Sequence, residues 1–149
     1  MGEWSAITAA IGVTLGGDRE GGRVELLRCW ADTAEQDHAQ RCVIAHYLAD
    51  TQDRLEDEVA WDQRALAEHG DVEDGDLAHL GVPSALGLLP SLHLNLGDGH
   101  LRSGDVELAA MHLRRGLAAA QVLGDDGYGA MIRGGLTRLQ ARLDEARGR

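Results

Sequence analysis

The 149-residue chain contains no lysine, so all 14 of its basic residues are arginine. This absence excludes Schiff-base chemistry, attachment of pyridoxal phosphate and a phosphate-loop lysine. Two cysteines, Cys29 and Cys42, are too few for a disulfide framework, and we expect both to be buried free thiols. No run approaches the ~18 consecutive apolar residues that cross a membrane, and the first residues lack the basic start of a signal peptide. We therefore expect a soluble, cytoplasmic protein with no membrane partner.

Positively charged residues are also scarce compared with negatively charged ones. The chain has 25 acidic residues against 14 basic ones, which gives a formal net charge of -11. Because such a surface repels phosphate backbones, we expect no nucleic acid partner. An acidic surface favours solubility or a basic partner.

Apolar residues recur at spacings of three and four, and no sustained period-two alternation is present, so the predicted fold class is all-α. The chain is long enough for a single domain over residues 1–149. An irregular acidic segment at about 70–90 is expected to be a solvated loop, because its spacing does not match a calcium loop. The predicted helices cover residues 4–15, 19–33, 35–52, 55–69, 90–102, 105–123 and 128–146.

The clearest motif lies between Leu92 and Leu117. This stretch fits one helix, a tight turn and a second helix, with its characteristic positions at Leu96-Gly97, His100, Gly104-Asp105, Ala109, Leu113 and Gly116. The pattern resembles a tetratricopeptide repeat. The resemblance implies antiparallel helix pairs stacked as a short right-handed solenoid.

The same pattern occurs twice earlier in a weaker form. Taking Gly17, Asp53 and Gly104 as equivalent turn positions, the residue twelve further on is small each time, as a close crossing of helices requires: Cys29, Ala65 and Gly116. The segment at about 70–90 lengthens the interval between the second and third turns. We therefore expect about three degenerate repeats and a capping helix.

In proteins of this family the first helix of each pair lines a concave surface. The resemblance thus implies a mixed apolar and acidic ligand-binding groove formed by Trp4, Ile7, Ile11, Val43, Tyr47, Asp50, Leu94, Asp98, Arg102 and Tyr128. Such a groove could hold a peptide with a basic anchor or a small amphipathic molecule. The expected function is a non-catalytic module that binds a protein or peptide and needs no cofactor.

A metal site is the first alternative. His38, Cys42 and His46 are spaced four apart, which puts them on one helix face, and Asp50 follows after four more residues. Imidazole, thiolate and carboxylate groups bind zinc or copper, and His93 and His100 could supply further ligands. Ligands at i and i+4 fill only part of a coordination sphere, and no CxxC or HExxH motif accompanies them. A structural role for these residues is therefore the competing interpretation.

An enzyme is the second alternative, with His46 as a general base oriented by Asp50, and with Asp98 and His100 near a second wall of the site. No GxSxG motif is present, and none of the four serines has an activating context. The oligomeric state is open as well. The N-terminal helix with Trp4, Ile7 and Ile11 has no preceding repeat to cover it, so both a homodimer through this end and a monomer are compatible with the sequence.

Overall fold

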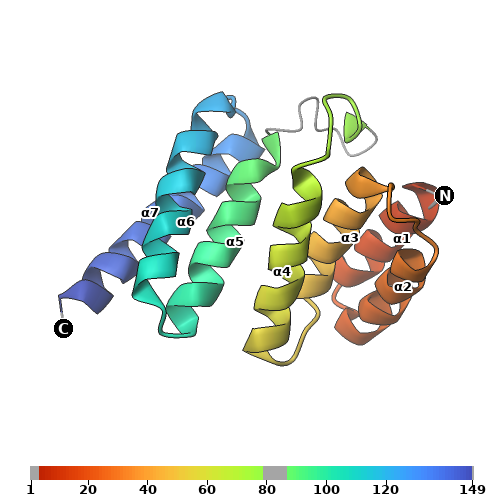
Figure 1. The fold of residues 1–149 in the computed structure, drawn as a ribbon, viewed down its shortest axis with the longest axis horizontal. Coiled ribbons are helices and arrows are strands. Elements are labelled where there is room, and N and C mark those ends of the chain that lie inside the picture. Colours follow the sequence, from red (N-terminus) through yellow and green to blue (C-terminus); the bar gives the residue numbers. More distant parts are fainter. Residues whose placement is uncertain (1–3, 79–86, 149) are drawn as a thin grey trace.

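The computed structural model describes residues 4–78 and 87–148, and within these ranges the chain forms helices and no β-strand. The prediction of an all-α fold is confirmed at this level. The elements are α1 (Trp4–Leu15), α2 (Arg19–Ala31), α3 (His38–Ala49), α4 (Leu55–His69), α5 (Leu89–Arg102), α6 (Val106–Ala119), the 3-10 helix η3 (Ala120–Val122) and α7 (Gly127–Arg147). Figure 1 shows them side by side, from α1 and α2 at one end to α6 and α7 at the other.

Each helix packs against its neighbours in sequence, and two further contacts join α1 to α3 and α5 to α7. The apolar side chains form two cores. The first is centred on α3, where Ile44 and Leu48 are fully buried, and the second lies between α6 and α7 around Leu136 and Leu139. Burying one such side chain contributes about 1.5–3 kcal/mol to folding. No described helix has both the length and the apolar character needed to cross a membrane.

Local sequence signals explain two of the helix-to-helix turns. Gly17 and Gly104 have φ values of 103° and 86°, a left-handed conformation that glycine adopts without a steric penalty. The aspartates that follow them cap the next helix. Asp18 Oδ1 accepts from the Gly21 amide at 2.9 Å, and Asp105 Oδ1 accepts from the Leu108 amide at 3.1 Å.

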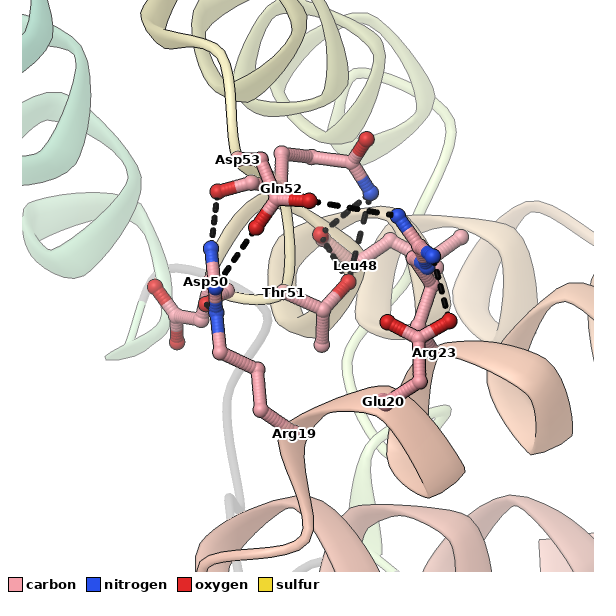
Figure 2. A network of polar contacts seen from close by, with 8 residues as sticks. All are labelled: Arg19, Glu20, Arg23, Leu48, Asp50, Thr51, Gln52 and Asp53. Carbon is pink, nitrogen blue, oxygen red and sulfur yellow. Dashed lines mark hydrogen bonds and ion pairs between the residues drawn. The ribbon is translucent and has the colours of Figure 1, made fainter.

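The turn between α3 and α4 has no glycine and is held by an arginine from another helix. Figure 2 shows Arg19, at the start of α2, reaching this turn. Its guanidinium donates to the carbonyl oxygens of Asp50, at 3.4 Å, and of Gln52, and it pairs with the Asp53 carboxylate at 2.8 Å. Because the last carbonyls of a helix lack partners within the helix, Arg19 satisfies groups that would otherwise need water.

Glycines allow α5 to approach its neighbours closely. A Cβ atom on Gly97 would lie 2.7 Å from Leu139 Cδ2 of α7, and one on Gly99 would lie 2.8 Å from Val59 Cγ2 of α4. Both distances are shorter than real Cβ contacts allow. The absence of a side chain therefore lets α5 sit tightly between these helices.

Several helix ends differ from the sequence-based prediction, and the third helix ends at Ala49 rather than residue 52. The second helix ends at Ala31 rather than residue 33, and the third begins at His38 rather than residue 35. Asp37 Oδ2 accepts from the Ala34 amide at 2.8 Å, and this side-chain turn replaces a helical turn. The sixth helix ends at Ala119 and continues as η3. Within the segment predicted at about 70–90, residues 79–86 lie outside the described residues, and α5 begins at Leu89.

Candidate functional site

Carboxyl groups from two helices gather where α4 packs against α5. Asp50 is the C-cap of α3, Glu58 lies in the first turn of α4, and Asp62 follows one helical turn later. We call Asp50, Glu58 and Asp62 the acid cluster. The three residues differ in exposure, since Asp50 is exposed, Glu58 is half-buried and Asp62 is only 2% exposed. The acid cluster thus extends from the surface into the protein.

Asp62 is the most perturbed member of the acid cluster. Burial raises the pKa of its carboxyl group to about 8, and the nearby carboxylates of Asp50 and Glu58 add to the rise. A hydrogen bond from Asn95 of α5 and the charge of Arg102 oppose the shift without cancelling it. The Oδ1 atom is buried and has no hydrogen-bond partner among the described residues. Near neutral pH the carboxyl group is therefore mostly protonated, and a nearby cation would favour its ionised form.

Asn95 also links the acid cluster to α3. Its Nδ2 atom lies 3.4 Å from Nδ1 of His46. Burial lowers the pKa of His46 to about 4, so the ring is neutral near pH 7 and Nδ1 can accept from the amide. His46 is thus an acceptor in a partly buried polar contact.

Two arginines bind the outer edge of the site. Arg102 of α5 pairs with Glu58 of α4, and its Nε donates to Asp98 at 3.0 Å. Arg142 of α7 donates to the other oxygen of Asp98 at 2.7 Å. The predicted groove residues Asp98 and Arg102 are therefore engaged with each other and with neighbouring helices. Asp50, in contrast, forms no ion pair through its side chain with any described residue.

The structure divides the predicted groove residues into three groups. Those with buried side chains pack between helices and present no surface to a ligand as the helices stand: Ile7, Ile11 and Val43. Those that are half-buried are Trp4, Tyr47, Leu94 and Asp98. Those that are exposed are Asp50, Arg102 and Tyr128.

Three of these residues, Tyr47, Asp50 and Tyr128, form an aromatic and acidic surface. Burial raises the pKa of Tyr47, and Asp50 and Tyr128 both lie near enough to raise it further. The Tyr128 hydroxyl contacts Ser91 Oγ at 2.5 Å, which holds the start of α7 against α5. Tyr47 of α3 thus lies near Tyr128 of α7 and near Asp50, which is a member of the acid cluster.

The candidate metal ligands on α3 have separate environments. His38 Nδ1 lies 2.6 Å from Glu68 of α4, whereas Cys42 is fully buried. Burial raises the pKa of the Cys42 thiol to about 12, which keeps it protonated. Across the described residues, no three His, Cys, Asp or Glu side chains are placed to hold a metal ion. The spacing of four residues thus places His38, Cys42 and His46 on one face of α3, but their side chains are not arranged to coordinate a metal ion.

The residues considered for catalysis do not meet either. His46 contacts Asn95 rather than Asp50, Asp98 binds two arginines, and His100 lies 5.4 Å from the His112 ring on the α6 side of α5. A general base needs its orienting carboxylate within hydrogen-bond reach. His46 has no such carboxylate among its contacts.

A second polar cluster lies between α5 and α6. His93 Nδ1 is 3.0 Å from His112 Nδ1, and the rings of His100 and His112 stack with an interplanar angle of 9°. We call His93, His100 and His112 the imidazole cluster, and all three side chains are buried. Burial lowers the pKa of His93 and lowers that of His112 to about 4, with the neighbouring imidazoles and Arg115 adding to the effect on His112.

The sequence analysis did not identify Asp62, Asn95 or His112 as site residues. A signal for two of them exists in helix periodicity. Asp62 is three residues before the buried Ala65, and His112 lies three residues after the buried Ala109. A polar residue on the buried stripe of an amphipathic helix indicates a buried polar contact, because its cost must be offset by a partner or a shifted pKa.

Comparison with known proteins adds no assignment. No family model, curated protein or solved structure matches this chain. Any function must therefore be inferred from the chemistry of the acid cluster, the imidazole cluster and the surfaces beside them.

Proposed function

We propose that this chain is a non-catalytic interaction module that binds a basic segment of a partner protein. The observation that carries the proposal is the acid cluster, in which a buried carboxyl group with an unpartnered oxygen lies beside Asp50 and Glu58. Bringing like charges together in a poorly solvated site is unfavourable, and a cationic side chain relieves that repulsion. The formal net charge of -11 also favours a basic partner.

The ligand would reach the acid cluster through its exposed member. A lysine or arginine side chain beside Asp50 would lie near Glu58 and would favour the ionised form of Asp62 without entering the core. Tyr47 borders the same position and offers an aromatic face to a cation. Apolar residues of the segment would then contact the half-buried side chain of Leu94 and the exposed ring of Tyr128.

The architecture we propose for this module is a diverged stack of tetratricopeptide-like helix pairs with α7 as its cap. Two features support it. Small buried residues recur after the three turns, at Cys29, Ala65 and Gly116, and α1 contacts α3 as α5 contacts α7. In such a stack, α1, α3 and α5 would line one surface, and the acid cluster would lie at its edge.

The binding experiment uses two fluorescein-labelled peptides and fluorescence anisotropy. One peptide alternates alanine with arginine, and the other replaces every arginine with glutamate. We expect only the arginine peptide to bind, and we expect the affinity to fall as salt is added. No binding of the arginine peptide at low salt would contradict the proposal.

Two variants that each remove one negative charge distinguish binding at the acid cluster from attraction to the whole acidic surface. Asp50→Asn alters the acid cluster, whereas Asp57→Asn alters an exposed carboxylate in the first turn of α4. We expect the first to weaken binding by about tenfold and the second by less than about twofold. Equal effects would indicate attraction to the whole acidic surface and would overturn the assignment of the site.

We also propose a homodimer through the N-terminal helices, with a different contact surface from the one the sequence suggested. Ile7 and Ile11 are buried within the protomer. The large apolar side chains that α1 and α2 leave exposed are Val13, Leu15, Val24 and Leu27. Such an interface would therefore use these residues.

A further inference from the structure

A hollow of about 460 Å³ lies between the start of α5, the end of α6 and η3. Its walls are mainly apolar. The described residues that line it are Leu89, His93, Arg115, Ala118, Ala119 and Val122, and of these His93 and Arg115 are polar. Ligand sites for small molecules have volumes of about 300–1,000 Å³ and combine apolar walls with a few polar groups. The hollow shares no residue with the acid cluster.

Arg115 gives this hollow an uncompensated positive charge. It forms no ion pair with any carboxylate in the part of the chain that the structure describes. Its charge instead acts on His93 and His112, the two imidazoles nearest the hollow. The other groups that act on these two rings are also histidines, namely His69 and His100, and no carboxylate is among them. A locally cationic site is thus present in a protein whose formal net charge is -11.

One of the two polar side chains that line the hollow, His93, is buried. His93 is only 5% exposed, and its Nδ1 is held 3.0 Å from His112 Nδ1. Gly116 lies beside it, where an added Cβ would be 3.3 Å from His93 Cβ. The contact with His112 therefore holds the ring of His93 at the wall of the hollow, which Arg115 also lines.

We propose that this hollow binds a small amphipathic carboxylate, with the carboxylate on the Arg115 guanidinium and the apolar body against Leu89, Ala118 and Val122. The guanidinium group has the planar, bidentate geometry that suits a carboxylate. Val122 is 54% exposed, so an apolar body placed against it would remove apolar surface from water. The two parts of the site thus match the two parts of the ligand.

Octanoate, octanol and octylammonium form a matched set of probes with the same apolar chain. We expect octanoate to shift the NMR signals of Ala118, Ala119 and Val122 saturably in the full chain. Octanol should bind at least about tenfold more weakly, because it lacks the charge-assisted contact with Arg115. Octylammonium should leave these signals unchanged. Equal binding of all three probes, or no saturable shift with octanoate, would overturn the proposal.

Two adjacent arginines on α6 provide the control variants. Both Arg114 and Arg115 are exposed, but only Arg115 lines the hollow, so neither substitution disturbs the core. We expect Arg115→Gln to weaken octanoate binding by about tenfold and Arg114→Gln to leave it within about twofold. Ala118→Leu should also weaken octanoate binding, because the larger side chain fills the hollow. An equal loss in the Arg114 and Arg115 variants would contradict the assigned site.

Discussion

The acid cluster and the imidazole cluster lie against two different stripes of the same helix. Asn95 and Arg102 of α5 face the acidic residues of α4, whereas His93 and His100 face His112 of α6. Both clusters bury titratable groups beside others of the same kind. One helix therefore separates two sites whose electrostatics have opposite sign.

In the two clusters, Asp62 and His112 are kept uncharged near neutral pH by pKa shifts in opposite directions. The pKa of Asp62 is raised to about 8, so its carboxyl group keeps a proton, whereas the pKa of His112 is lowered to about 4, so its ring loses one. Burial is the largest cause in both cases. Desolvation always disfavours the charged form, and the type of residue decides the direction of the shift.

The largest effect is expected from Asp62→Asn at alkaline pH. The folded protein keeps a proton on Asp62 that the unfolded chain releases above its ordinary pKa of 3.8. The stabilisation from this group is therefore complete below pH 3.8 and is lost as the pH rises to about 8, by up to ~1.4 kcal/mol per pH unit. We expect the variant to lose this slope and to be more stable than the wild type at pH 9 by several kcal/mol, with an upper bound of roughly 6 kcal/mol. Urea denaturation across this pH range measures both quantities.

Asp57→Asn is the matched control, because it removes an exposed carboxylate from the same helix. It should leave the pH dependence of the unfolding free energy within about 0.5 kcal/mol of the wild type. If the Asp62→Asn variant is less stable than the wild type at pH 9, then hydrogen bonds or charges in the folded protein compensate the ionised carboxylate for its burial. The claim that burial keeps the acid cluster's Asp62 uncharged near neutral pH would then be wrong.

His112→Gln should have a smaller effect, and it should act at acidic pH. The folded-state pKa of about 4 lies below the ordinary 6.5, so the unfolded chain binds a proton that the folded protein excludes. The stabilisation from this group is complete above pH 6.5 and is lost as the pH falls to about 4, by about 2–3 kcal/mol in total. We expect the variant to lose most of this acid sensitivity in urea denaturation between pH 4 and 7.

His38→Gln provides a control, because the pKa of His38 is shifted in the opposite direction to that of His112. A hydrogen bond to Glu68 raises the pKa of His38, so its stabilisation is present below pH 6.5 and is lost as the pH rises through the folded-state pKa. Removing it should leave the acid-side loss of the wild type intact. The same change in pH dependence for the His38 and His112 variants would contradict the assignment of the loss to burial in the imidazole cluster.

The helices were predictable from the sequence because their signals are local. Gly17 with Asp18 and Gly104 with Asp105 mark two turns and the caps that follow them, and the structure has the expected geometry at both. The predicted start of the third helix is too early. The side-chain turn at Asp37 competes with a helical turn there, and the periodicity of apolar residues does not reveal this competition.

The sites were less predictable because they join residues from distant parts of the chain. Helix periodicity places a residue on a face but does not identify the helix that covers that face. Ile11 and Val43 were assigned to a groove by resemblance, and the packing of adjacent helices buries them instead. Asn95 joins His46 of α3 to Asp62 of α4, and no spacing within one helix predicts such a contact.

The smallest effect is expected from Arg19→Gln, which lies outside both clusters. Arg19 is half exposed, so its ion pair with Asp53 contributes little. Its hydrogen bonds to the carbonyls of the α3–α4 turn matter more, and we expect a loss of about 1 kcal/mol in unfolding free energy. Arg28→Gln, which removes only an exposed pair with Glu25 on the same helix, should cost less than about 0.5 kcal/mol. Because neither residue belongs to a cluster, urea denaturation should give the same difference from the wild type at pH 5, 7 and 9. A difference that varies with pH for Arg19→Gln would mean that the turn couples to the acid cluster through Asp50, and the acid cluster would then extend as far as α2.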